Sequence, residues 1–572
     1  TMAPQPKNTS LPNRPVRVKP TSLRLSAWKT SAMRGLIGSA LVLASCLAAA
    51  APASAAWLKA SSRHFVVYSE GGEDGLRKQA MELEKFDAAL RHMQRLRDDP
   101  DAEFNKVTVY VLPSISSVQS LLRRDNVAGI YLPRVTGSVA FTARDGDRGG
   151  LNGRIVLFHE YTHHFLLGHF TQAYPAWFSE GYAEFASTAM EKNGDYWVGS
   201  AAQHRAYSLF DGGVSLSAAQ LFAPPARMSD GQMGLLYARG WLLTHMIQFD
   251  PALAGKFGRY VTSLNTGIPN LTAATQAFGD LKALDRKMDA YLRQSRLTAL
   301  TIKGNLPTGE VTVRPLSAGE AALIRMRMES TAGVGAKTAG PLYARAKAAI
   351  RRAGDDPSAE GRTVAQGWLA EMAYDAGDDA GAEAAADAAL ALDPVSSQAL
   401  LYKARVHLRR LTAAKSTDKA AWTEARSWLL KANRANTNDA AVLAVFYSSF
   451  DAEGAPPSKG AIAGLYRAVE LSPQDTGLRF TAARQRLIDG DAEWAKTLLR
   501  PLAFDPHAAA DNMAARLLAV LDAGGKGPAA LELLRKAAGA ADAAANDRGG
   551  TAGTGVGRGA GTEAGTGAGG SR

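Results

Sequence analysis

Five consecutive residues have the types and spacing of a metal-binding helix: His159, Glu160, Tyr161, Thr162 and His163. Side chains four residues apart share one face of an α-helix, so the two imidazoles can bind one metal ion. Glu160 is turned by about 100° from His159, and we expect it to reach a water on the metal instead of the metal itself. A carboxylate there can accept a proton from the attacking water, which is the chemistry of metal-assisted hydrolysis.

A second acidic motif follows after sixteen intervening residues. The run from Pro175 to Phe185 predicts an amphipathic helix that turns back toward the first one. Glu180 on this helix can supply the carboxylate that completes a three-ligand zinc site with an open position. Glu184 lies one turn further on the same face and can accept a hydrogen bond from a ligand imidazole. The roles of the two glutamates are interchangeable in principle, and we favour Glu180 as the zinc ligand.

Together the two motifs, H-E-Y-T-H and P-x-W-x-x-E-G-x-A-E-F, resemble those of the gluzincin clan. The closer resemblance is to the peptidase MA-like domains of exported bacterial proteins, several of which carry tetratricopeptide repeats. It covers roughly residues 57–300 and implies an α+β zincin-like catalytic domain. It also implies zinc on His159, His163 and Glu180, with Glu160 as the catalytic residue.

Other residues near the motifs have competing interpretations. Tyr237 resembles the tyrosine that stabilises the oxyanion in related enzymes, but a buried core tyrosine is an equally good interpretation. His164 and His169 are expected to be packing or surface residues, because a third imidazole would compete with Glu180. Arg239 fits a charge on a helix surface better than a group that steadies the intermediate. Residues 139–143 predict an ordinary sheet strand, with an edge strand that pairs with substrate as the alternative.

The residues that must position this site divide into two stretches. From 57 to about 145, strand-like runs at His64–Tyr68 and Val107–Leu112 flank a helix whose apolar face runs from Leu76 to Met93. From 153 to about 300 the pattern is mostly helical. Residues 57–300 therefore predict one α+β domain, and residues 301–340 predict a linker with a candidate short strand at Glu310–Val313.

Residues 341–540 predict an all-α domain with internal repeats. Two alanines stand 12 and 5 residues before a proline in two places: Ala382, Ala389 and Pro394, and again Ala461, Ala468 and Pro473. Gly377 and Gly490 stand where helix pairs are expected to turn. The pattern resembles the tetratricopeptide repeat, a helical hairpin with small residues at its packed positions. A generic alanine-rich bundle is the alternative. Residues 541–572 are rich in Gly, Ala and Thr and predict a disordered tail.

The N-terminal segment 1–56 predicts an export signal. Basic residues precede an apolar run from Gly35 to Ala50, and Ala53-Ser54-Ala55 fits the small-x-small rule for cleavage. An uncleaved anchor or a lipidated Cys46 is the alternative, and either would be the only membrane attachment. The body is expected in the periplasm or outside the cell.

Charge and cysteine content exclude several functions. The formal net charge of +12 falls to +5 without the seven basic residues of 1–56, which is weak support for nucleic-acid binding. Cys46 is the only cysteine, so a cysteine nucleophile and a cysteine-bound zinc are excluded for the body of the protein.

The sequence favours a zinc-dependent peptidase that acts on peptides or proteins in the cell envelope, with repeats that bind a protein partner. The alternative is an interaction scaffold of the tetratricopeptide type with an inactive or merely metal-binding zincin domain.

Overall fold

The structure is a computed structural model that describes residues 57–547, except 126, 146, 149, 150, 211, 212, 226, 295 and 510. All described residues belong to one compact unit. The predicted export signal in 1–56, with Cys46, and residues 548–572 of the predicted tail lie outside this range. Within the described residues, no helix is long and apolar enough to cross a membrane.

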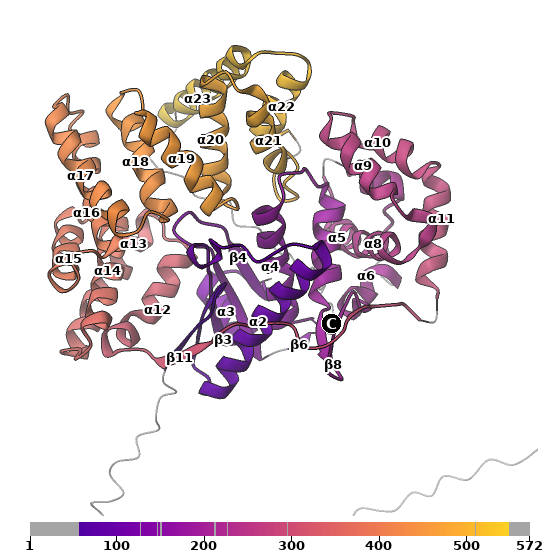
Figure 1. The fold of residues 1–572 in the computed structure, drawn as a ribbon, viewed down its shortest axis with the longest axis horizontal. Helices are drawn as coiled ribbons and strands as arrows, with labels where there is room; N and C mark the ends of the chain where they lie inside the picture. The colour runs from indigo at the N-terminus through magenta and orange to yellow at the C-terminus, as the bar shows by residue number, and fades with distance from the viewer. Residues whose placement is uncertain are drawn as a thin grey trace, which may run out of the picture. The chain divides into compact units, whose positions relative to one another are not determined.

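A six-stranded mixed sheet forms the centre of the N-terminal region (Figure 1). Its spatial order is β11 (Thr312–Pro315), β1 (Leu58–Ser61), β2 (Phe65–Ser69), β3 (Val107–Ser114), β5 (Val139–Asp145) and β4 (Gly129–Leu132). Strands β2, β3 and β5 run parallel, and the other three pair antiparallel. The strands predicted at 64–68 and 107–112 are confirmed, because β-branched and aromatic residues suit a pleated surface that is buried on both faces.

Strand β5 corrects one alternative from the sequence. It lies between β3 and β4, with Val109 and Tyr131 as the two cross-strand neighbours of Ala140. Its backbone groups are therefore paired on both sides, so it is an ordinary sheet strand and not an edge that could pair with substrate. The two edges of the sheet are β4 and β11.

Helices cover both faces of the sheet. Helices α2 (Glu73–Gln94) and α4 (Gly153–His169) pack on one face, where the rings of Phe86 and Phe158 stack with centroids 3.9 Å apart. The other face is covered by α3 (Ile115–Leu122) and by helices α12 (Ala318–Ala332), α13 (Ala336–Ala353) and α14 (Ala359–Asp375). Alternation along the strands sends Val109 to the first core and Tyr110 to the second.

The segment predicted to be a linker, 301–340, is built into this architecture. It contains β11, which pairs with β1 along its whole length, and α12, whose buried Leu323 and Ile324 lie in the same core as Tyr110. Strand β10 (Leu300–Ile302) leads into it and pairs with β9 (Asp195–Val198). The C-terminal helices are therefore attached to the sheet through a shared core.

The remaining elements of the N-terminal region are helices, short strands and 3-10 turns. The helices are α5 (Ala176–Ser187), α6 (Ala206–Phe210), α7 (Ala218–Phe222), α8 (Asp230–Phe249), α9 (Lys256–Asn265), α10 (Asn270–Phe278) and α11 (Leu281–Leu292). The short strands are β6 (Asp147–Arg148), β7 (Leu151–Asn152) and β8 (Met190–Lys192), and the 3-10 turns are η1 (Ala102–Phe104), η2 (Gln203–Arg205) and η3 (Pro251–Leu253). Helices α5 and α8 touch at two glycines, since a Cβ on Gly181 would lie 2.2 Å from the carbonyl carbon of Gly240.

The C-terminal region is a succession of helices packed on their neighbours. They are α15 (Asp379–Leu392), α16 (Ser397–Ala413), α17 (Lys419–Ala435), α18 (Ala440–Glu453), α19 (Lys459–Leu471), α20 (Thr476–Ile488), α21 (Ala492–Ala503), α22 (Met513–Asp522) and α23 (Gly527–Asp547). The four repeated alanines have no exposed surface: Ala382, Ala389, Ala461 and Ala468. Gly377 and Gly490 have φ of 79° and 82° at the turns between helices, as predicted. Helix α23 extends into the range predicted to be disordered, where its alanines favour a helix.

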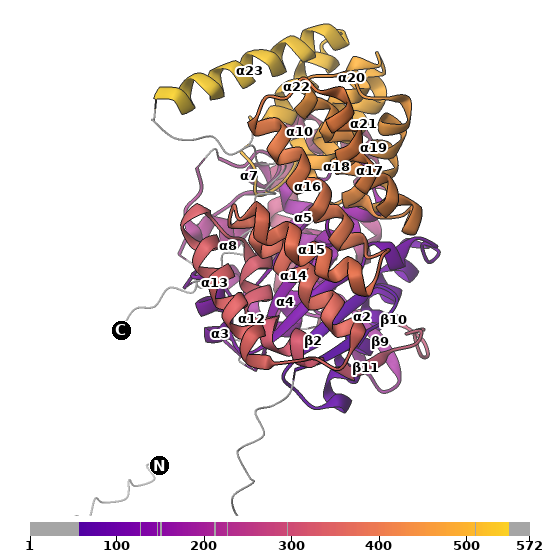
Figure 2. The same ribbon diagram turned by 90° about the vertical axis from the view of Figure 1, so that its left-hand side faces the viewer.

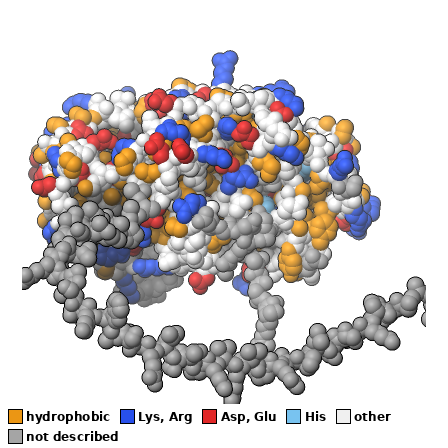
Figure 3. Space-filling model, turned by 90° about the horizontal axis from the view of Figure 1, so that it is seen from below, with side chains coloured by type: hydrophobic (Ala, Val, Ile, Leu, Met, Phe, Trp, Pro, Cys, Tyr) orange, Lys and Arg blue, Asp and Glu red, His pale blue; other side chains and the backbone are white. Residues whose placement is uncertain are grey.

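Helices α12 to α16 lie on one side of the sheet, and helices α5 and α8 lie on another (Figure 1). Helices α12 to α16 lie on the side away from α5 and α8 (Figure 1), and in Figure 2 they stand in front of the sheet. On the face drawn in Figure 3, basic and acidic side chains of the described residues are interspersed, which agrees with the weak net charge of the body. The chain thus has an N-terminal region with a mixed α/β sheet, followed by a mostly helical region.

Candidate metal centre

Helix α4 holds the two histidines of the first motif. Its N-terminus is capped by Asn152, whose side chain accepts a hydrogen bond from the backbone N–H of Ile155. The helix lies between the sheet, α2 and α5, so residues on almost all of its faces are buried. His159 and His163 lie one turn apart on the face toward α5, as their spacing predicts.

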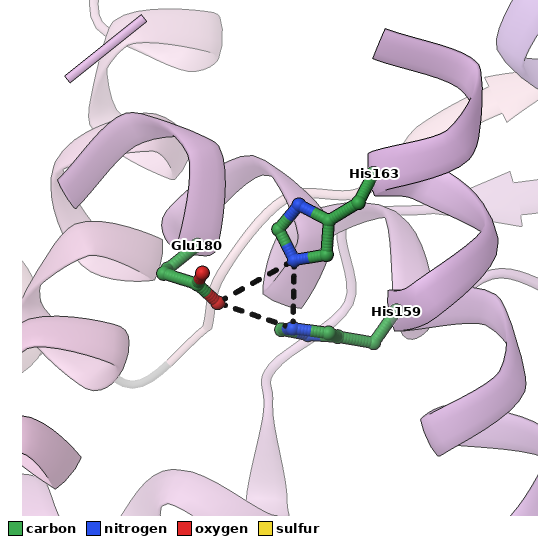
Figure 4. Close-up of side chains that lie close together, drawn as sticks. All are labelled: His159, His163 and Glu180. Atoms are coloured by element: carbon green, nitrogen blue, oxygen red, sulfur yellow. Dashed lines mark hydrogen bonds and ion pairs between the residues drawn. The ribbon is translucent and has the colours of Figure 1, made fainter. Parts of the chain in front are cut away.

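Three ligand atoms converge at this face (Figure 4). The Nε2 atoms of His159 and His163 lie 3.2 Å apart. The Oε2 atom of Glu180, from α5, lies 3.2 Å from the first and 3.5 Å from the second. The structure therefore brings together the three residues predicted to be zinc ligands.

The chemistry of this cluster fits a cation. Glu180 is fully buried, and its oxygens lie 3.2–3.5 Å from the imidazoles of His159, His163 and His507 without a well-aligned hydrogen bond among the described residues. Burial raises the pKa of Glu180, but the imidazoles of His163, His159 and His507 hold it well below its usual range. The buried carboxylate is therefore charged, and a metal ion would neutralise that charge. Although burial lowers the pKa of His159, Glu180 and Glu184 raise it to about 10, so the site electrostatically favours positive charge. Two imidazoles and one carboxylate are a zinc ligand set.

Glu184 lies beside the His159 ring, within reach of the ligand imidazole that it is predicted to orient. Its Oε1 is 3.1 Å from Nδ1 of His159, the ring nitrogen that faces away from Glu180. It also accepts hydrogen bonds from His204 Nε2 at 2.6 Å and from Arg205 Nη2 at 2.5 Å. Burial raises the pKa of Glu184, but Arg205 and the two histidines hold it well below its usual range. A charged Glu184 can therefore fix the orientation of the His159 ring.

The sequence did not point to His204 and Arg205. Both lie in or beside η2, about twenty residues after Glu184, in a stretch without a recognisable motif. The guanidinium of Arg205 also lies 4.9 Å from the ring centroid of Tyr237. The two motifs contain the glutamates Glu160, Glu180 and Glu184. Buried carboxylates need cationic partners, and this is the one sequence signal for residues such as Arg205.

Glu160 is buried on α4 and does not belong to the cluster of ligand atoms. Its Oε2 has no hydrogen-bond partner among the described residues. Burial raises the pKa of this carboxyl, and the nearby His159 and His163 oppose the rise. Glu160 thus has the properties of a buried carboxylate that is available to a small molecule in the site.

Tyr237 of α8 lies against the same histidine. Its ring is nearly parallel to that of His159, with an interplanar angle of 18° and centroids 6.0 Å apart. Burial and the charge of Glu180 raise the pKa of Tyr237 well above its ordinary value. The hydroxyl therefore keeps its proton and can donate a hydrogen bond.

Three other residues near the motifs have structural partners. His164 Nδ1 lies 2.7 Å from the Tyr131 hydroxyl, and burial lowers the His164 pKa to about 3. His169 Nδ1 lies 3.0 Å from the carbonyl oxygen of Phe165, one turn back on α4. Arg239 forms ion pairs with Asp285 and Asp289 of α11. All three lie outside the cluster of ligand atoms.

A second group of clustered ligand types involves His64, Glu84 and Asp87. These acids already have cationic partners, because His64 Nδ1 lies 2.7 Å from Glu84 and Arg91 lies 2.5 Å from Asp87. Burial lowers the pKa of His64, but Glu84, Asp87 and Asp98 raise it overall. This group is therefore an ion-pair network.

One further imidazole reaches the first cluster from the C-terminal helices. His507 Nε2 lies 3.2 Å from Glu180 Oε1. A histidine so far along the chain gave no signal in the sequence motifs.

No protein-family model matches the chain, and a search of curated proteins found no match.

Proposed function

We propose that the chain is an exported zinc-dependent peptidase that hydrolyses peptide bonds with a metal-activated water. The observation that carries the proposal is the convergence of His159, His163 and Glu180, whose buried carboxylate has no well-aligned hydrogen bond among the described residues. The resemblance of both motifs to the gluzincin clan, and to its peptidase MA-like domains, supports the same assignment.

The proposed chemistry divides between the metal and Glu160. A zinc ion held by the three ligands would supply Lewis acidity and lower the pKa of a water molecule. Glu160 has an unpartnered buried oxygen, so it can take a proton from the water and pass it to the leaving amine. Its raised pKa suits a group that must accept and then release a proton.

Two other side chains would assist this reaction. Glu184 holds the His159 ring through Nδ1, which keeps Nε2 directed toward the ligand cluster. Tyr237 stacks on the same ring and keeps its proton, so its hydroxyl can donate to the oxyanion of the tetrahedral intermediate.

The remaining parts of the proposal concern location and partners. The segment 1–56 directs export to the periplasm or beyond, with a membrane attachment only through an uncleaved anchor or a lipidated Cys46. The helices of 341–540 form tetratricopeptide-like repeats that bind a protein partner or present a protein substrate. Nucleic acid is not a partner.

The alternative, a scaffold with an inactive metal-binding domain, is supported less well. A site that only holds metal has no need for the unpartnered buried oxygen of Glu160, because such a group costs stability.

Metal removal tests the proposal. The purified full chain should contain about one zinc, following the three-ligand site, and should cleave an unfolded protein. A chelator should abolish cleavage, and added zinc should restore it. Zinc that binds without supporting cleavage of any protein or cell-wall peptide would contradict the peptidase assignment.

A further inference from the structure

The two oxygens of Glu180 face different partners. Oε2 faces the ligand imidazoles, 3.2 Å from His159 and 3.5 Å from His163. Oε1 faces His507, whose Nε2 lies 3.2 Å away. The ring of His507 also stands at 83° to the ring of His163, with centroids 6.3 Å apart.

His507 does not belong to the ligand atoms that lie within 4.8 Å of one another. Its placement therefore differs from that of a fourth ligand. A carboxylate that gives one oxygen to a metal commonly has its other oxygen held by a neighbouring group, which fixes its orientation. His507 stands in that place relative to Glu180.

We propose that His507 is a positioning residue for Glu180, and that the C-terminal helices thereby complete the metal centre. This inference rests on the proposed zinc site. His507 would act through Glu180 by holding Oε1, so that Oε2 stays directed at the two imidazoles.

The loop that carries His507, between α21 and α22, is held by local hydrogen bonds. The backbone N–H of His507 donates to the side chain of Asp505 at 2.9 Å. Asn512 caps α22 and donates through its side-chain amide to the carbonyl oxygen of Ala503 at 3.3 Å. These contacts limit the conformations from which the imidazole can reach Glu180.

The neighbouring helix pair, α19 and α20, docks on the end of α4. Arg479 is 3% exposed and donates through Nη2 to the carbonyl oxygen of Leu167 at 3.0 Å, in the last turn of the helix that carries His163. Gln474 is 1% exposed and donates to Asn105 at 2.7 Å and to Ser138 at 3.1 Å. The repeats that carry His507 are therefore attached to the helix that carries two of the ligands.

The test compares variants of the full chain by zinc affinity and by the visible spectrum of the Co²⁺ form. H507A removes the imidazole, while H507Q keeps an N–H donor of similar reach and H507N carries the same amide one bond shorter. H407A is the matched control, because His407 Nε2 lies 3.1 Å from Glu383 Oε1, within the repeats and away from the site.

H507A and H507N should raise the zinc Kd by about 10- to 100-fold, the usual effect of losing a group that orients a ligand. They should also shift the Co²⁺ absorption bands. H507Q should stay close to wild type, and H407A should change neither property. Circular dichroism of the zinc-free proteins checks that the variants are folded. If H507A is unfolded, the comparison of H507Q with H507N decides.

A wild-type zinc Kd and spectrum for H507A and H507N would overturn this inference alone. A wild-type chain that binds no zinc would overturn it together with the proposed function. A chain that binds zinc in a His507-dependent way but cleaves nothing would support the positioning role and overturn the peptidase assignment.

Discussion

The N-terminal region and the C-terminal helices bury different side chains. Most of the largest fully buried residues, such as Trp177, Trp241 and Phe158, lie in the N-terminal region. The C-terminal helices bury alanines at their contacts, such as Ala382 and Ala461. Bulky rings build rigid walls around a site, whereas small residues let successive helices pack closely.

Buried polar groups sharpen this contrast. In the N-terminal region they include the candidate metal centre, where His159 contacts both Glu180 and Glu184. Several of those in the C-terminal helices, among them Gln474 and Arg479, lie at the contact with the N-terminal region. The C-terminal helices therefore carry buried polar contacts where they meet the N-terminal region as well as within themselves, as between Arg426 and Ser449.

Loss of a ligand should have the largest effect. E180A removes the carboxylate between His159 and His163, so the chain should no longer purify with stoichiometric zinc and should lose all zinc-dependent cleavage. Elemental analysis measures the zinc. E383Q, in the C-terminal helices, should keep both properties, and a zinc-replete E180A would show that the ligands lie elsewhere.

Close packing of helices α5 and α8 predicts the next effect. G181A places a Cβ 2.2 Å from the backbone of Gly240, so it should lower the free energy of unfolding by about 3 kcal/mol. The counterpart in the C-terminal helices is G464A, whose Cβ would meet Leu443 at an ordinary 3.4 Å. This change should be neutral or stabilise α19 by up to about 1 kcal/mol. Urea denaturation compares the two, and equal effects would remove the contrast between the regions.

The partners of His159 predict a smaller effect on the metal. E184Q removes the charge that faces Nδ1 of His159, and it should raise the zinc Kd by about 10- to 100-fold. The control is E453Q, which weakens a buried ion pair with Arg426 within the C-terminal helices. Competition with a chromophoric chelator measures the Kd, and an unchanged value for E184Q would mean that Glu184 does not orient the ring.

The His64 network predicts the smallest effect, a dependence of stability on pH. The folded-state pKa of His64 is raised, so its contribution to stability is complete below the unfolded pKa and is lost as the pH rises through the folded pKa. Wild type should therefore exceed H64Q in stability by about 1 kcal/mol at low pH, with a smaller difference at high pH. Urea midpoints of both proteins from low to high pH measure the stability difference. A difference that does not change with pH would contradict the raised pKa of His64.

Local patterns in the sequence predicted most of the elements and the convergence of His159, His163 and Glu180. The spacing of His159 and His163 fixes their shared helix face, and the β-branched runs at 64–68 and 107–112 form strands because both faces are buried. The role of 301–340 was missed, since pairing between β11 and β1 joins residues more than 250 apart. Arg205 and His507 were missed for the same reason, because neither has a local pattern that links it to Glu184 or Glu180.

The central claim is that Glu160 activates water at a zinc site without holding the metal. The most direct test measures zinc content and cleavage of an unfolded protein for wild type and E160Q. The account predicts about equal zinc in both proteins and a fall in kcat/KM of about 100-fold or more for E160Q. Cleavage by E160Q at the wild-type rate would contradict it.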